Sequence, residues 1–343
     1  MVSTTEPSIW TVSISPHVKS KESVEKIMWT VVACLIPPLI LSIFIFGFQT
    51  LIITLVSVGS CVATEAISQK LLHRPTSIKD GSAVITGLLL AYIIPPGVPY
   101  WMPILGAVIA IFVTKHLMGG IGFNIWNPAL MGRAFLLATY PVAITSAWLP
   151  PIRDASIFKY MGPGVDAVST ATPLYVLKHY GIAAVIEKFG TMSTIYRDFF
   201  IGWRPGCIGE TSALFLLIGG LFLIYKRYIT WHTPVSVIVS IGFFTWVFGG
   251  EKFFSGNPLL AVLSGGVMLG AFFMATDYVT SPNQKPAKLI FGAGVGALTV
   301  LIRLKGGYPE GICYAILLMN GLSPALDGWF KPERFAPEKG AIK

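Results

Sequence analysis

The stretch IMWTVVACLIPPLILSIFIFG, residues 27–47, contains no charged side chain, and a second apolar run, residues 49–69, follows it almost at once. Each run is long enough for an α-helix to cross a lipid bilayer, which takes roughly 20 predominantly apolar residues. Residues 1–26 are polar, and the first run lacks the small-residue cleavage site that ends a signal peptide. We therefore predict a membrane protein whose first apolar run is retained as a signal-anchor helix.

The composition of the 343 residues extends this prediction to the rest of the chain. Hydrophobic residues make up 54% and charged residues only 12%, whereas soluble proteins carry about 25% charged residues. These values exclude a soluble enzyme, a disordered chain and a fibrous repeat. The four cysteines form no C-x-x-C pair and the five histidines stand alone, so we predict neither a disulfide framework nor a metal site.

Further apolar runs predict an all-α polytopic membrane protein with about ten transmembrane helices. The expected spans are 27–47, 49–69, 80–95, 99–117, 123–145, 211–226, 231–249, 257–276, 286–304 and 309–328. Several are shorter than a full span, and 80–95 ends at a Pro-Pro pair. Such a segment is either a broken helix near a binding site or a short helix buried in the bundle, and the sequence favours neither.

The two halves of the chain resemble one another. GSAVITGLLLA at 81–91 resembles GGVMLGAFFMA at 265–275, and each half later carries Pro-Ala-Leu, at 128–130 and 324–326. Because five helices is an odd number, the second half has to be inverted in the membrane, as in many transporters. We divide the chain into a tail and first five-helix repeat (1–145), a long polar loop (146–210), and a second five-helix repeat with a C-terminal tail (211–343).

The net charge of +9 is explained mainly by topology. With a cytoplasmic N-terminus, the cytoplasmic segments carry more lysine and arginine than the short external ones, and long loops weigh little in this rule. Arg303 and Lys305 are exceptions. We therefore expect both termini in the cytoplasm, the 146–210 loop outside, and no binding of nucleic acid.

Within the long loop, residues 165–174 read VDAVSTATPL. Thr172 is suited to be a helix N-cap, with Pro173 as the first helical residue. The same geometry suits a phosphate, because the N-terminus of a helix offers free N–H groups and a partial positive charge. From the residues alone, the plain cap is the better interpretation.

Residues 166–172, DAVSTAT, resemble the flavinylation motif D-x-x-[ST]-x-A-T, in which a flavin transferase joins FMN through its phosphate to the final threonine. Three further segments resemble the same family in order: NPALMGRAFL at 127–136, GCIGETSAL at 206–214 and FFMATD at 272–277. This is the RnfD/NqrB family, whose members are membrane subunits of the Rnf complex, the ferredoxin:NAD⁺ oxidoreductase, and of the sodium-pumping NADH:quinone oxidoreductase. Ser15 to His17 and Asp80 to Ser82 also fit it, whereas Ala167 stands where glycine is common.

The resemblance implies covalent FMN on Thr172, outside the membrane, as a one-electron relay between ferredoxin and NAD⁺. The supporting residues would be Asp166, Ser169, Arg133, Glu210 and Thr211. An arginine within a membrane helix costs at least about 2.5 kcal/mol on insertion scales, so Arg133 should face the bundle, either in an internal ion pair or holding the flavin. The chain would not be catalytic alone, because it shows no iron–sulfur ligands and no nucleotide-binding domain.

The resemblance also implies a second, non-covalent flavin, riboflavin, and transport of Na⁺ or H⁺. We assign Asn124 and Asn127 to the second flavin, although capping after a glycine turn explains them equally. Glu65 and Asp277 are candidates for an ion path, because acids within a membrane are functional by default. A buried pair for Glu65 and a cap role for Asp277 stay open. Expected partners are flavin and iron–sulfur subunits in a bacterial inner membrane.

Two other functions fit the composition. A small-molecule transporter on the same inverted repeat would explain the repeat without the threonine motif, and a structural anchor for redox subunits would leave that motif without use. A bound flavin distinguishes all three. The segment GAGVG at 292–296 lies in an apolar span without a preceding strand, so it indicates close helix packing rather than NAD binding.

Overall fold

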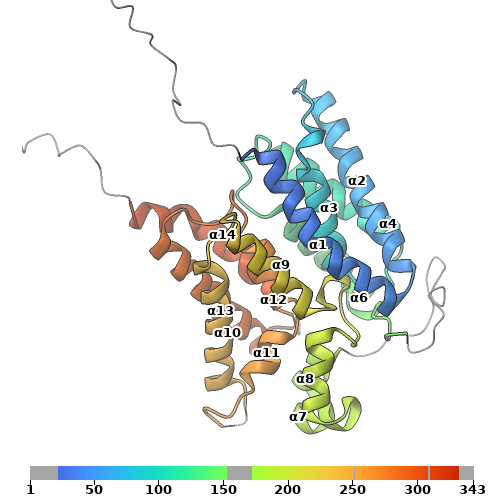
Figure 1. Ribbon diagram of the computed structural model, residues 1–343, viewed down its shortest axis with the longest axis vertical. Coiled ribbons are helices and arrows are strands. Elements are labelled where there is room, and N and C mark those ends of the chain that lie inside the picture. The colour runs from blue at the N-terminus through green and yellow to red at the C-terminus, as the bar shows by residue number, and fades with distance from the viewer. Residues whose placement is uncertain (1–21, 153–171, 251, 308–309, 332–343) are drawn as a thin grey trace, which may run out of the picture.

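The computed structural model describes residues 22–152, 172–250, 252–307 and 310–331, and in these residues all regular secondary structure is helical (Figure 1). The helices of the first half are α1 (Val24–Phe46), α2 (Gln49–Leu71), η1 (Ile78–Asp80), α3 (Ser82–Tyr92), α4 (Trp101–Val108), the π-helix η2 (Ile109–His116), α5 (Pro128–Thr139) and α6 (Pro141–Ser146). They pack mainly around α2, which contacts α3, α4 and η2.

The helices of the second half are α9 (Ala213–Tyr225), α10 (His232–Phe248), α11 (Pro258–Leu263), α12 (Val267–Leu269), the π-helix η4 (Gly270–Met274), α13 (Lys285–Lys305) and α14 (Ile312–Trp329). Here α10 packs along α13, and α13 along α14. The two halves meet where α9 lies against α1 and α14 against α5. Figure 1 shows the halves as blue-green and orange-red bundles with α9 between them.

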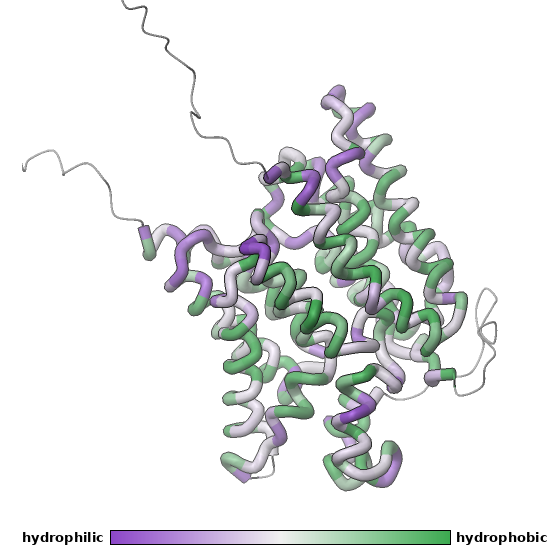
Figure 2. Tube along the Cα trace, in the orientation of Figure 1, coloured by the Kyte–Doolittle hydropathy of each residue, from purple (hydrophilic) through white to green (hydrophobic). Residues whose placement is uncertain are grey.

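The surface of the bundle is that of a membrane protein. Helices α1, α2 and α13 are long and apolar enough to cross a membrane, and four shorter stretches, within α3, α4 with η2, α9 and α10, are apolar as well. Large apolar side chains such as Leu55, Ile67 and Val239 are about 60% exposed. Figure 2 shows apolar residues along the helices and hydrophilic ones gathered toward their ends. The prediction of a helical, polytopic membrane protein agrees with this architecture.

Nearly all expected spans coincide with a helix to within a few residues, but two of them are interrupted. The expected span 257–276 consists of α11 and the contiguous helices α12 and η4. A break at Ser264 to Gly266 separates α11 from α12. Gly265 and Gly266 have φ of 63° and 67°, a left-handed conformation that glycine adopts without steric cost. The expected span 123–145 ends at Thr139 and resumes at Pro141 as α6, because proline cannot continue the hydrogen bonding of α5.

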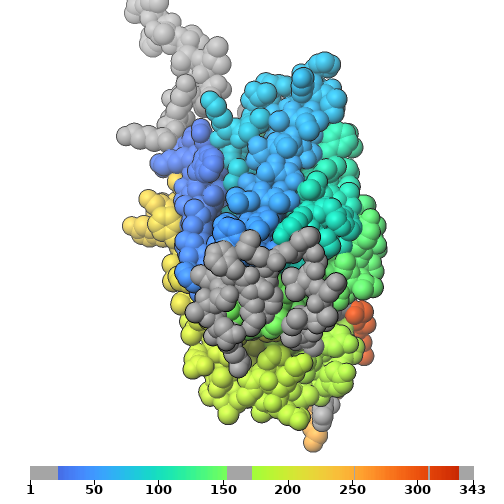
Figure 3. Space-filling model, turned by 90° about the vertical axis from the view of Figure 1, so that its right-hand side faces the viewer, coloured from blue at the N-terminus to red at the C-terminus, as the bar shows by residue number. Residues whose placement is uncertain are grey.

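The long polar loop contains two helices in its described part, α7 (Pro173–Phe189) and α8 (Met192–Ile201), followed by the short η3 (Ile208–Glu210). Val176, Val185, Ile195 and Phe199 form a small core that also includes Leu260 of α11. The loop is therefore folded onto the second half of the bundle. It forms the yellow-green end of the molecule in Figure 3.

Candidate functional site

Thr172 begins the folded part of the long loop and is the N-cap of α7. Its Oγ1 accepts a hydrogen bond from the backbone N–H of Tyr175 at 3.3 Å, and Pro173 is the first helical residue. The predicted cap is thus confirmed. Thr172 is also buried, with 6% of its surface exposed. Asp166 and Ser169, which the sequence places in the same motif, lie outside the described residues.

The first turn of α7 touches the break between α11 and α12. A Cβ atom added at Gly265 would lie 2.6 Å from Cδ1 of Leu174 and 2.5 Å from a guanidinium nitrogen of Arg303. The side chain of Leu174, two residues after Thr172, and the guanidinium of the buried Arg303 therefore both lie against Gly265. The glycine at this position is what allows the helix start, the break and the arginine to approach one another.

Two buried arginines bind the carbonyl groups at the end of α11. Arg303 donates to the oxygens of Ala261 at 2.8 Å and Ser264 at 2.9 Å, and Arg204 donates to the oxygen of Leu263 at 2.9 Å. The last carbonyls of a helix lack partners within it and carry partial negative charge, which cations stabilise. Arg303 is therefore held inside the protein by backbone carbonyl groups.

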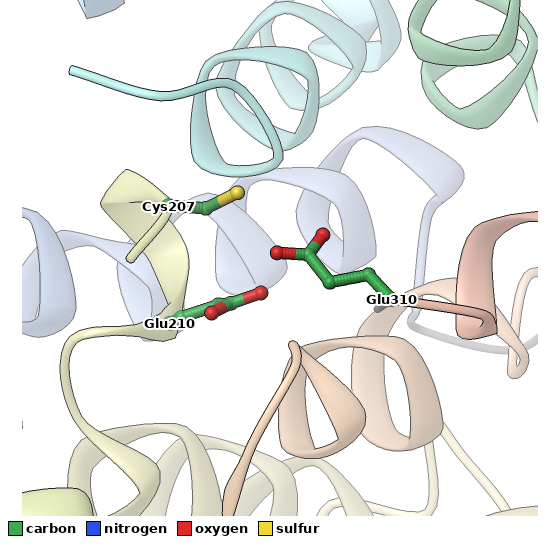
Figure 4. Close-up of side chains that lie close together, drawn as sticks. All are labelled: Cys207, Glu210 and Glu310. Carbon is green, nitrogen blue, oxygen red and sulfur yellow. The ribbon is translucent and has the colours of Figure 1, made fainter. Parts of the chain in front are cut away.

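Glu210 fills the space in front of α12. Cβ atoms added at Gly206 and Gly266 would lie 3.1 and 3.2 Å from its two carboxylate oxygens. The side-chain atoms of Cys207, Glu210 and Glu310 that could bind a ligand all lie within 4.8 Å of one another, and Figure 4 shows the three groups pointing toward a common space. They come from the connector before α9 and the connector before α14.

Arg133 lies beside this group and forms an ion pair with Glu310. We call Arg133, Arg204, Cys207, Glu210, Arg303 and Glu310 the arginine cluster. Burial and the neighbouring Glu310 raise the pKa of the Glu210 carboxyl, and the arginines act in the opposite direction. The sequence had left an ion pair and flavin binding open for Arg133, and the structure supplies the ion pair.

Other contacts of the connector are local. The Cys207 thiol donates to the oxygen of Ile93 at 3.3 Å, at the end of α3. The Thr211 hydroxyl donates to the oxygen of Ile208 at 3.1 Å, so this candidate residue closes the η3 turn.

A second set of buried charges lies between α2, α3 and η2. Lys115 donates to both carboxylate oxygens of Glu65 and to the hydroxyl of Ser82, each at 2.7 Å, and Gln69 donates to Glu65 at 3.1 Å. We call these four residues the lysine cluster. Glu65 is completely buried, so it takes the buried-pair arrangement that the sequence left open beside an ion path.

A cavity of about 120 Å³ opens next to the lysine cluster. Its polar lining includes Asn124, Asn127, Asp277 and Lys115, and its aromatic lining includes Phe272. Asn127 caps α5 through its Oδ1, which accepts from the N–H groups of the second and third helical residues at 3.1 and 3.3 Å. Asp277 accepts from the hydroxyl of Thr280 at 3.1 Å. The structure thus brings three candidate residues from both halves to one cavity.

The sequence-predicted residues therefore form two groups. Thr172, Arg133, Glu210 and Thr211 gather near the break before α12, and Asn124, Asn127, Asp277 and Glu65 gather at or beside the cavity. Sequence reasoning missed the buried partners that complete each group, which are Arg204, Cys207, Arg303, Glu310 and Lys115.

The family model for the NQR2, RnfD, RnfE family matches residues 11–336. The chain belongs to this family. It is 47% identical over 333 residues to the D subunit of the proton-translocating ferredoxin:NAD⁺ oxidoreductase complex of Clostridium ljungdahlii, and the match covers 97% of this chain and 98% of that protein. It is 44% identical over 331 residues to the D subunit of the Na⁺-translocating ferredoxin:NAD⁺ oxidoreductase complex of Acetobacterium woodii, covering 96% and 94%.

A more distant member of the NQR2, RnfD, RnfE family is the D subunit of the ion-translocating oxidoreductase complex of Escherichia fergusonii. It is 36% identical over 361 residues, covering 97% of this chain and 100% of that protein. The resemblance seen in the short motifs therefore extends over nearly the whole chain.

Proposed function

We propose that this chain is a membrane subunit of an ion-translocating electron-transport complex that links ferredoxin and NAD⁺, and that it carries FMN covalently on Thr172 as a one-electron relay. The names of its relatives, all D subunits of ion-translocating oxidoreductase complexes, support the complex. The position of Thr172, a buried N-cap within the flavinylation motif, is the observation that carries the covalent FMN. A flavin transferase would attach it.

The residues around Thr172 fit a phosphate-linked flavin. Pro173 has no N–H and the N–H of Tyr175 already donates to Thr172 Oγ1, so a phosphate on this oxygen would replace an existing cap, at a helix N-terminus whose partial positive charge suits it. Arg303 lies against Gly265, as does Leu174 of the same helix turn as Thr172. FMN would supply the redox chemistry, while the chain fixes its place and sets the surrounding charge.

The cavity beside the lysine cluster fits the second flavin, riboflavin, bound without a covalent link. The amide groups of Asn124 and Asn127 and the carboxylate of Asp277 could bind the polar edge or the ribityl hydroxyls, and Phe272 offers an apolar wall. Ligand sites are commonly apolar pockets with a few placed polar groups. The cavity lies between the two halves, and transporters built from inverted repeats commonly bind ligands at the interface of their repeats.

We further propose ten transmembrane segments in two inverted five-helix repeats, with both termini cytoplasmic and the Thr172 loop outside a bacterial inner membrane. The corresponding short helices α3 and α12 support this, because each follows a glycine in the left-handed conformation, Gly81 or Gly266. The partners would be flavin and iron–sulfur subunits.

The transported ion would be Na⁺ or H⁺, since the names of the two most similar relatives reported above differ in this respect. Asp277 and Glu65 are the candidate path residues. Asp277 faces the cavity, whereas Glu65 would have to part from Lys115 to bind an ion.

The test compares Thr172→Ala with Thr191→Ala, the same substitution at the N-cap of α8, in a host that makes a flavin transferase. We expect covalent flavin fluorescence of the denatured chain to vanish in Thr172→Ala and to persist in Thr191→Ala. Losing the cap of α7 costs about 1 kcal/mol, and the Thr191 side chain makes no cap hydrogen bond, so both variants should fold. Fluorescence retained in Thr172→Ala would refute the attachment site, and its absence from the parent chain would favour a transporter.

A further inference from the structure

The arginine cluster contains one carboxylate that its neighbours leave without a hydrogen bond. Glu310 is held by Arg133, and the guanidinium groups of Arg204 and Arg303 donate to backbone oxygens. Among the described residues, no donor binds the side chain of Glu210, although it is only 8% exposed. A mostly buried carboxylate without a hydrogen-bond donor lowers the stability of the fold, so its presence calls for a functional explanation.

The geometry argues against a metal ion in this space. Cys207, Glu210 and Glu310 could offer three ligand atoms, but the guanidinium of Arg133 already occupies Glu310, and those of Arg204 and Arg303 lie near enough to act on Glu210 electrostatically. Three fixed positive charges would repel a divalent cation. The cavity beside Glu210 measures only about 10 Å³, which holds at most about one water molecule, so a hydrated ion does not fit.

A proton needs no such space. The charges of the arginine cluster favour binding of a proton when a negative charge is added nearby. The three guanidinium groups carry one positive charge more than the two carboxylates, and this charge works against the raised pKa of Glu210 while the flavin is oxidised. Glu310 is fixed by Arg133 and faces Glu210 as a like charge, which favours the protonated form of Glu210. An additional electron nearby acts in the same direction.

The position for that electron is close by. Leu174 in the first turn of α7 and Arg303 both reach Gly265, and Glu210 reaches the adjacent Gly266. Leu174, two residues after Thr172, and Glu210 therefore lie against adjacent glycines of the same break, which joins the start of α7 to the arginine cluster. Reduction of a flavin attached to Thr172 would add negative charge on the side of the cluster that α7 covers, and charges act over longer distances in a region of low dielectric than in water.

We propose that the Glu210 carboxylate binds one proton when an electron reaches the FMN on Thr172, which makes the arginine cluster a redox-coupled proton site. The electron comes from a flavin or iron–sulfur partner subunit, and the proton comes from water and joins the carboxylate oxygen to give a neutral carboxylic acid. Reoxidation of the flavin returns both. The other titratable groups here are the thiols of Cys207, within the cluster, and Cys313, beside it. Each thiol donates to a backbone oxygen and neither donates to Glu210 or Glu310. The inference rests on the proposed covalent FMN.

The experiment is redox-difference infrared spectroscopy of the purified complex from a flavin-transferase-positive host. On reduction we expect a protonated-carboxyl C=O band that shifts in heavy water. Glu210→Gln should lose this band, and Glu187→Gln, an exposed acid of α7, should keep it. The same band in Glu210→Gln would overturn the proposal.

Glu310→Gln provides a test that does not remove the proposed acceptor. Without the like charge of Glu310, Glu210 should bind its proton less readily, so the band should appear only at lower pH than in the parent protein. An unchanged pH dependence would overturn the role given to Glu310. Should Glu210→Gln fail to fold, the pH dependence of the band in Glu310→Gln still tests the proposed proton site.

Two further results separate the alternatives. A parent protein that carries no covalent flavin overturns the proposed function and this inference with it, whereas a flavin without the infrared band overturns the inference alone. Zinc or iron bound in a one-to-one ratio, and lost in Cys207→Ser, would show that the cluster is a metal site instead.

Discussion

The lysine cluster and the arginine cluster are both buried sets of charges between packed helices, but they differ in how completely their groups are bound. In the lysine cluster the ammonium group donates three hydrogen bonds, and the only carboxylate accepts from Lys115 and Gln69. In the arginine cluster the Nε atoms of Arg133, Arg204 and Arg303 have no partner, and neither does the carboxylate of Glu210 among the described residues. The lysine cluster is centred on one ion pair, with the His116 ring 3.8 Å from Glu65 and without a hydrogen bond, whereas the arginine cluster has one positive charge to spare.

This difference follows from the backbone around each cluster. Lys115 lies on a π-helix, a wider form than the α-helix that often occurs at functional sites, and it reaches the start of α3 without any break in a neighbouring helix. The arginine cluster surrounds the break at Ser264 to Gly266, where carbonyl groups have lost their helical partners. In the lysine cluster the ion pair stabilises the fold, whereas the arginine cluster can respond to a change of charge.

Removing the lysine of the closed pair should have the largest effect on stability. Lys115→Met leaves Glu65 buried and unpaired, which costs about 3–5 kcal/mol, so we expect poor yield and a clearly lowered Tm in detergent. The double variant Glu65→Leu with Lys115→Met should recover most of the loss, because it removes both charges. If the double variant were as unstable as the single one, the cluster would do more than pair two charges.

Removing the cation of the ion pair in the arginine cluster should lower the stability by less. In Arg133→Gln, Glu310 loses its partner, but two guanidinium groups remain nearby, so we expect a loss of about 1–3 kcal/mol, as for one unsatisfied buried group. The comparison of the two Tm values measures the difference between the clusters. A drop as large as that of Lys115→Met would contradict the idea that the arginine cluster has charge to spare.

The cavity beside the lysine cluster can be tested through Asp277. Asp277→Asn keeps the shape but removes the charge, so we expect Na⁺ or H⁺ transport coupled to electron transfer to fall about tenfold, the equivalent of roughly 1.4 kcal/mol, with the flavin content unchanged. Ion uptake into vesicles and flavin absorbance measure the two quantities on one preparation. Normal pumping would remove Asp277 from the ion path.

The smallest effect is expected at the wall of the same cavity. Asn127→Ala removes the cap of α5, which costs about 0.5–2 kcal/mol, and should also lower the amount of riboflavin released when the protein is denatured. Covalent FMN should stay constant, since Thr172 lies at the other cluster. Equal loss of both flavins would indicate a general folding defect rather than a local site.

Much of this architecture could be predicted from the chain. Apolar runs located the helices, and the caps at Thr172 and Asn127 followed from local residue order, because a helix start depends on neighbours within a few positions. Of the helices within the polar loop, only the start of α7 at Thr172 and Pro173 was predicted. Their remaining apolar residues, such as Val185 and Phe199, are spread among charged ones.

The clusters could not be predicted, because their members lie far apart in the sequence. Arg133 and Glu310 are separated by 177 positions, and Lys115 and Glu65 by 50. The break before α12 was also hidden, since a Gly-Gly pair in an apolar run is typical of close packing in membrane helices. One signal was available in Arg303, which did not fit the expected topology and which the structure buries.

The most direct test of the central claim is intact and peptide mass spectrometry of the chain purified from a host that makes a flavin transferase. The account predicts a mass gain of one FMN minus water, located on the peptide that contains Thr172 and absent from Thr172→Ala. An unmodified Thr172 peptide from that host, or the same gain on another residue, would contradict it.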